Sequence, residues 1–193
     1  MTKDDSVRKE ILEHAQALFQ QFGMKKTTMD EVAASCGKGK STLYHYFKSK
    51  EEVFDAVIRL EMVDLRRKVK DKVEEHKSML EKIKVYLMEF YREVIHKANL
   101  YRIIDHEHIL EAKARKLFLE MMEFEQSYII RIMEDGYDSG EYNNVNRSEI
   151  PWIAEAFLAA FYGLVQYSIE KKGYFDEERI QKVVNLFVPK LFN

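Results

Sequence analysis

Four lysines alternate with hydroxyl, phenol and imidazole side chains over a short stretch near the start of the chain. The lysines are Lys38, Lys40, Lys48 and Lys50, and the polar residues between them include Ser41, Thr42, Tyr44, His45 and Tyr46. These are the groups that contact phosphates and base edges in a DNA groove. The segment 27–52 therefore predicts a surface that binds nucleic acid. The alternative is a solvated charged face with no ligand.

Two short helices are predicted to position these side chains. A capping-box pattern at Thr28 starts a helix over 29–35. Two glycines then permit a tight turn, and a second helix follows at about 40–47. Leu43 and Phe47 lie four residues apart, so both face the core. The polar residues are left on the outer face or at the helix start, and this arrangement predicts a helix-turn-helix.

Charge is distributed unevenly along a chain whose total is −2. Residues 1–50 contain nine Lys or Arg against six Asp or Glu, a net of +3, which leaves −5 for the remainder. A local basic surface on an acidic body suits a protein that holds DNA with one end only. Two prolines and seven glycines among 193 residues, of which 46% are hydrophobic, favour an all-α fold with an ample core.

Helices are also predicted on both sides of this stretch. Ser6 is expected to cap a first helix over 6–22, which Gly23 ends in a left-handed conformation. Ser49 starts a long helix that reaches about residue 76. Its apolar pattern thins after residue 61, so we expect a mostly solvated rod that connects two packed bodies.

The remaining chain also predicts helices. Ser78 starts the next one, and one short and one long helix are expected between residues 99 and 135. Gly136 and Gly140 are expected to close the long helix. The spacing of Leu117, Met121, Phe124, Tyr128 and Ile132 supports the long helix.

A nearly all-apolar helix is predicted over 148–171, capped by Ser148, and Asp176 caps a last helix. A helix that is apolar on all faces is buried on all faces, and at the edge of the chain this requires a second molecule. We therefore expect a homodimer. Its expected contacts are Trp152, Ala156, Ala159, Ala160, Gly163, Gln166 and Tyr167.

Residues 6–60 resemble the N-terminal domain of TetR/AcrR-family transcriptional regulators. The resemblance rests on Phe22-Gly23, on TTMDEVA at 27–33 and on STLYHYFKSKEE at 41–52. It implies a DNA-binding domain over 1–48, with the match extending to about residue 60. A ligand-binding and dimerisation domain follows over 49–193, and the whole chain has about nine helices. Lys38 and Gly39 depart from the family pattern, which has valine and serine there.

The resemblance also implies roles for individual residues. Thr27, Thr28 and Lys50 would contact phosphates at helix starts. Lys40, Ser41 and Thr42 would enter the major groove, and Tyr44, His45 and Tyr46 would meet backbone or bases. Lys38 is expected to extend outward and add a cation near the DNA backbone.

Aromatic and methionine side chains are abundant in the second domain. They are expected to line an apolar pocket for a small-molecule effector, with a few polar groups among them. The alternative is that they form an ordinary core. The candidate residues are Phe90, Tyr91, Arg102, His106, Phe118, Met121, Met122, Phe124, Tyr128 and Tyr162.

Other chemistry has little support. Cys36 is the only cysteine, and it is a small core residue or a redox sensor. The sequence DHEH at 105–108 places too few ligands on one helix face for a metal site. We find no nucleophile–base pattern, so no enzyme and no cofactor are expected. The polar N-terminus and the absence of a long apolar run predict a cytoplasmic protein with no membrane partner.

These features predict a sequence-specific regulator. The expected partners are a near-palindromic double-stranded operator, a second copy of the chain and an apolar or aromatic effector that releases a repressor from DNA. Two alternatives stay open. One is an activator of the same family, and the other is a helical small-molecule-binding protein or enzyme with a degenerate helix-turn-helix.

Overall fold

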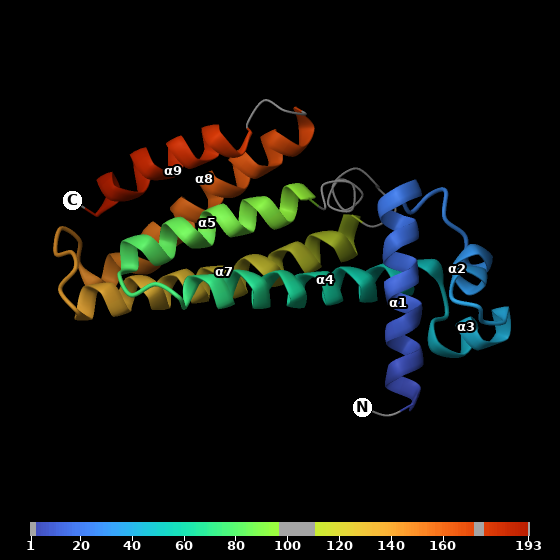
Figure 1. Ribbon diagram of the computed structural model, residues 1–193. Helices are drawn as coiled ribbons and strands as arrows, with labels where there is room; N and C mark the ends of the chain where they lie inside the picture. Colours follow the sequence, from blue (N-terminus) through green and yellow to red (C-terminus); the bar gives the residue numbers. More distant parts are fainter. Residues whose placement is uncertain (1–2, 97–110, 172–175, 193) are drawn as a thin grey trace. The chain divides into compact units, whose positions relative to one another are not determined.

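The computed structural model describes residues 3–96, 111–171 and 176–192. These residues are helical almost throughout, and the predicted all-α class is confirmed (Figure 1). The elements are α1 (Lys3–Phe22), α2 (Met29–Ser35), α3 (Lys40–Tyr46), α4 (Lys50–Val73), α5 (Met79–His96), α7 (Glu111–Asp138), η2 (Arg147–Glu149), α8 (Ile150–Glu170) and α9 (Glu177–Leu191). The short helix expected after Asn99 lies outside the described residues.

The described chain divides into two compact units. The first comprises 3–64 together with 111–115, and the second comprises 65–96, 116–171 and 176–192. The division falls inside α4, between Asp64 and Leu65, whereas the sequence suggested a boundary between residues 48 and 49. The helix α4 is continuous, so it contributes side chains to both cores.

The first unit is built on α1. Ile11, Ala15 and Phe19 are fully buried along one face of this helix, and the Phe19 ring meets Phe54 of α4 edge-on at 5.3 Å. The helix begins at Lys3, so the prediction that Ser6 caps it is wrong. Gly23 ends α1 with φ +80°, as predicted, because glycine adopts this left-handed conformation without a Cβ clash.

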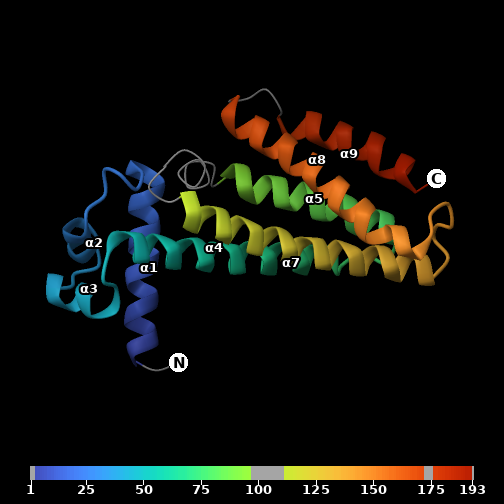
Figure 2. The same ribbon diagram turned by 180° about the vertical axis from the view of Figure 1, so that it is seen from behind.

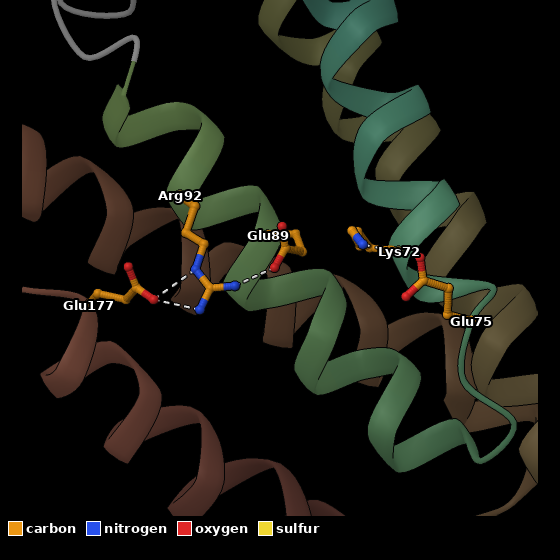
Figure 3. Close-up of polar contacts among 5 residues, drawn as sticks. All are labelled: Lys72, Glu75, Glu89, Arg92 and Glu177. Carbon is orange, nitrogen blue, oxygen red and sulfur yellow. Dashed lines mark hydrogen bonds and ion pairs between the residues drawn. The ribbon is translucent and has the colours of Figure 1, made fainter.

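The second unit is a helical bundle in which α5 packs against both α8 and α9 (Figures 1 and 2). At one edge of this packing, Arg92 of α5 binds two carboxylates, Glu89 of its own helix and Glu177 in the first turn of α9 (Figure 3). The Asp176 carboxylate accepts the Arg179 amide at 2.9 Å, so the predicted cap of the last helix is confirmed.

Three predictions about local structure in this unit are corrected. The second half of α4 is not mostly solvated, because Leu65, Val69 and Val73 are buried at a four-residue spacing. Ser148 does not cap α8, because it lies inside the 3-10 turn η2, and α8 begins at Ile150. Gly136 does not close α7, since the helix continues to Asp138.

A close contact explains Gly136. A Cβ at this position would lie 2.6 Å from Met79 of α5, so only glycine lets the two helices approach this closely. Gly140, with φ +75°, is the residue that turns the chain after α7.

Candidate nucleic-acid interface

The start of α2 has the predicted capping box. The Thr28 hydroxyl accepts the Glu31 amide at 3.2 Å, and the Glu31 carboxylate accepts the Thr28 amide at 2.8 Å. After α2, Gly37 adopts φ +62° and turns the chain toward α3. Gly39 is the N-cap of α3 and provides no side-chain hydrogen bond. These local bonds fix the two helices of the helix-turn-helix.

The inner face of α3 is anchored in the core. Leu43 and Phe47 are completely buried, and the Arg8 guanidinium lies over the Phe47 ring at 5.1 Å. This anchoring leaves Ser41, Tyr44 and His45 exposed and Thr42 half-buried. The outer face of α3 therefore offers hydroxyl, phenol and imidazole groups together, as the sequence predicted.

Each of the four lysine ammonium groups has an oxygen partner within this unit. Lys38 lies 3.0 Å from Glu10 of α1, and Lys40 lies 2.9 Å from Asp30 of α2. The Asp30 carboxylate raises the pKa of Lys40 through this hydrogen bond and its charge. Lys48 and Lys50 instead donate to main-chain carbonyl oxygens, those of Tyr44 at 3.4 Å and Met24 at 2.8 Å.

The remaining predicted DNA contacts differ in exposure. Thr28 is exposed at the start of α2, whereas Thr27 is only 1% exposed and donates its hydroxyl to the Gly23 carbonyl at 2.8 Å. Burial removes the Thr27 hydroxyl from the surface. The half-buried Tyr46 donates its hydroxyl to Asp4 at 2.6 Å, an interaction that joins α3 to the first turn of α1.

Some of the predicted effector-binding residues lie in one aromatic cluster of the second unit. Phe90 of α5 lies 5.4 Å from the Tyr162 ring of α8, and both side chains are buried. Tyr86 joins the cluster, 5.9 Å from Phe90 and 6.1 Å from Tyr128 of α7. Tyr91 is also buried, and Met122 is half-buried.

The other candidates are not placed in this cluster. Phe124 is 50% exposed, and its ring lies under the Arg66 guanidinium at 4.0 Å. Arg102 and His106 fall outside the described residues, as do the side chains of Phe118 and Met121.

A buried carboxylate that was not predicted from the sequence lies beside the aromatic cluster. Glu125 is 2% exposed and accepts two hydrogen bonds, from the Tyr86 hydroxyl at 2.8 Å and from Arg66 Nε at 3.1 Å. Burial raises the pKa of Glu125, although both hydrogen bonds act in the opposite direction. Spacing was the sequence feature that could have revealed this burial. Glu125 lies four residues before the buried Ile129, so the two share one face of the helix.

The predicted dimer contacts form an exposed apolar face on α8. Trp152 is 72% exposed and Tyr167 is 40% exposed. Between them Ala156, Ala159, Ala160 and Gly163 are exposed and Gln166 is half-buried. A Cβ built on Gly163 meets no atom within 4 Å. On α9, Leu186 and Phe187 are also more than half exposed.

By length and composition alone, residues 147–170 would suffice to cross a membrane, and about a third of their most apolar stretch is buried within the chain. From the sequence, no apolar run of this length was expected. A large exposed apolar face marks an interaction site. Small residues in the middle of the face would let another helix approach closely.

Two other candidate chemistries can be placed. The Cys36 side chain is buried, and its thiol donates to the Val32 carbonyl at 3.2 Å, which is the environment of a core residue. Among the described residues, no group of three His, Cys, Asp or Glu side chains has the geometry to hold a metal ion. The 105–108 segment lies outside them.

Comparisons with known proteins identify relatives of this chain. Residues 11–57 match the family model described as bacterial regulatory proteins, tetR family. The uncharacterized HTH-type transcriptional regulator YfiR of Bacillus subtilis (strain 168) is 31% identical over 179 residues, which cover 91% of this chain and 84% of YfiR.

A second relative and a solved structure are also named as regulators of transcription. The HTH-type transcriptional repressor KstR2 of Mycobacterium tuberculosis (strain ATCC 25618 / H37Rv) is 27% identical over 72% of this chain and 70% of its own length. A transcriptional regulator from Cytophaga hutchinsonii ATCC 33406 has the same fold, with a TM-score of 0.74 at 24% identity. That match covers 93% of this chain and 95% of the other.

Proposed function

Because this chain belongs to the tetR family of bacterial regulatory proteins, whose members are DNA-binding transcriptional regulators and not enzymes, we propose that it is a homodimeric repressor. It would act in the cytoplasm on a near-palindromic operator. An apolar or aromatic small molecule would bind the second unit and release the protein from DNA. The repressor role is supported by the relative KstR2, which is named as a repressor.

The observation that carries the proposal is the outer face of α3. Ser41, Tyr44 and His45 project from a helix that is anchored by the completely buried side chains of Leu43 and of its C-cap residue Phe47. A rigidly held helix that presents such side chains can enter the major groove and contact base edges and phosphates. One copy offers few base contacts, so specificity requires two copies at a fixed spacing of about 34–36 Å.

The exposed face of α8 is the surface that would pair two copies. Burying Trp152 and Tyr167 against a partner removes large apolar areas from water, and Gly163 permits close helix contact. A lipid bilayer is the other apolar environment that could cover this helix. Glu155 opposes insertion because it is an exposed charge within the helix, and a charge at the bilayer centre is costly.

Release by an effector would act through α4. This helix contributes Val53 and Val57 to the first core and Leu65 and Val69 to the second. A ligand that displaces its second half would also disturb its first half. The ligand must favour the state that does not bind DNA by a few kcal/mol, since only differential affinity shifts the population.

Selection of duplexes from a random-sequence pool by the purified protein tests the central claim. We expect enrichment of a two-fold symmetric sequence with half-sites about one helical turn apart. A failure to enrich any duplex would favour a helical small-molecule-binding protein whose helix-turn-helix no longer functions. A reporter gene placed behind the enriched sequence then separates a repressor from an activator.

A further inference from the structure

The two lysines that flank Gly39 are each held by a carboxylate from another helix. Lys38 Nζ lies 3.0 Å from Glu10 of α1. Lys40 Nζ lies 2.9 and 3.1 Å from the two carboxylate oxygens of Asp30 on α2. Lys38 immediately precedes the N-cap of α3 and Lys40 is its first residue, next to the outer face formed by Ser41, Tyr44 and His45, which we call the reading surface. A carboxylate at this place competes with DNA phosphates for the lysine ammonium group. Its negative charge also repels those phosphates.

The other two lysines of the helix-turn-helix are held differently. Lys48 and Lys50 donate to main-chain carbonyl oxygens, which have no net charge. Their positive charge therefore stays available to attract phosphates. The charges of Lys38 and Lys40 are offset by carboxylates at hydrogen-bonding distance. The reading surface is thus less basic than its lysines suggest.

We propose that Glu10 and Asp30 determine specificity by withholding Lys38 and Lys40 from DNA of the wrong sequence. Binding to arbitrary DNA depends on phosphate contacts alone, and there the carboxylates, at 3.0 and 2.9 Å, compete with the phosphates for both lysines. At the operator, base contacts hold α3 in the groove and bring phosphates close enough to take over both lysines. The inference rests on the proposed reading surface.

The exposure of the two pairs allows this exchange. In the Lys40–Asp30 pair the side chains are 62% and 64% exposed. Because an ion pair so exposed adds little stability, phosphates that base contacts hold beside Lys40 can replace Asp30 at little cost. The Lys38–Glu10 pair is less exposed, at 28% and 42%, so Lys38 is released less readily. Lys40 is therefore the first of the two lysines to transfer to phosphate.

The test compares the wild type with Asp30→Asn and Glu10→Gln by fluorescence anisotropy. The probes are a duplex selected by the wild-type protein and a shuffled duplex of the same composition, each titrated at several salt concentrations. We expect affinity for the shuffled duplex to rise about tenfold in each variant, and affinity for the selected duplex to rise less than about threefold. The salt slope on the shuffled duplex should steepen by about one for each lysine freed.

Two controls separate this role from general charge repulsion. Glu13→Gln removes the same charge from α1, but Glu13 pairs with Lys9 and not with a lysine of the reading surface. It should leave the affinity for the shuffled duplex nearly unchanged. In a Lys40→Gln background, Asp30→Asn should have no further effect, because the lysine that it would free is gone. All variants should keep the wild-type melting temperature.

The inference is overturned if the ratio of the two affinities stays constant, if Glu13→Gln matches Glu10→Gln, or if Asp30→Asn acts equally without Lys40. A wild-type protein that selects no duplex would instead refute the proposed function on which the inference rests.

Discussion

Arg66 of α4 donates its Nε–H to a carboxylate oxygen of Glu125 on α7 at 3.1 Å, and the carboxylate side chain is only 3% exposed. The Tyr86 hydroxyl of α5 donates to the other oxygen at 2.8 Å, so one buried carboxylate joins three helices. A buried ion pair is weak support for stability, because the cost of desolvation offsets the attraction. Its contribution is to fix the position of α4 relative to α5 and α7.

Removal of Arg66 alone should be strongly destabilising. Arg66→Met leaves the Glu125 charge buried without its cation, and we expect a loss of about 2–4 kcal/mol in the free energy of unfolding, measured by urea denaturation. Arg66→Met/Glu125→Gln should recover at least half of that loss. Arg67→Met is the matched control, since Arg67 is 62% exposed, and should change stability by less than about 0.5 kcal/mol. Equal losses in Arg66→Met and the double variant would contradict this account.

The raised pKa of Glu125 predicts a pH dependence. Its ordinary value is 4.5, and burial raises the pKa in the folded protein. Between the two values the folded state binds more protons than the unfolded state, so the contribution of Glu125 to stability falls as pH rises. Subtracting the unfolding free energy of Glu125→Gln from that of the wild type isolates this contribution. The difference should decrease from about pH 4.5 toward neutrality. An increase would mean that Arg66 lowers the pKa instead.

The Tyr44 side chain should contribute to DNA affinity and not to folding. It is 38% exposed on the outer face of α3, so Tyr44→Ala should keep the wild-type melting temperature. We expect this variant to lose about 1–3 kcal/mol of binding free energy for the selected duplex, measured by anisotropy. Tyr44→Phe separates a contact of the hydroxyl from a contact of the ring. Unchanged affinity in Tyr44→Ala would remove this residue from the interface.

The face of α8 should determine the oligomeric state. Trp152→Asp and Gly163→Arg place charged or bulky groups at exposed positions of one protomer, so each chain should fold. Sedimentation equilibrium should show monomers for both variants and a dimer for the wild type, because an unpaired charge is costly in an apolar interface. Val63→Asp, at an exposed apolar site on α4, should stay dimeric. Dimers in all three variants would place the interface elsewhere.

Local signals allowed the helix-turn-helix to be predicted from residues alone. Three of its features depend on residues within a few positions of one another. They are the Thr28–Glu31 capping box, the end of α1 at Gly23 and the inward pair Leu43 and Phe47. The outer face of α3 and the apolar surface of α8 also follow from helical periodicity. Hydrogen bonding of the backbone and the 3.6-residue repeat act within one element, so a sequence expresses them directly.

Contacts between distant segments were decided only by the tertiary structure. Lys38 was expected to extend toward DNA, but Glu10 of another helix lies 3.0 Å from its ammonium group. Gly136 was expected to end a helix, but it lets α7 pack against Met79. Glu125 shares a helix face with apolar residues, yet its partners Arg66 and Tyr86 come from two other helices. The sequence determined which elements form, whereas packing determined which charges are paired, because pairing depends on side chains that only the folded chain brings together.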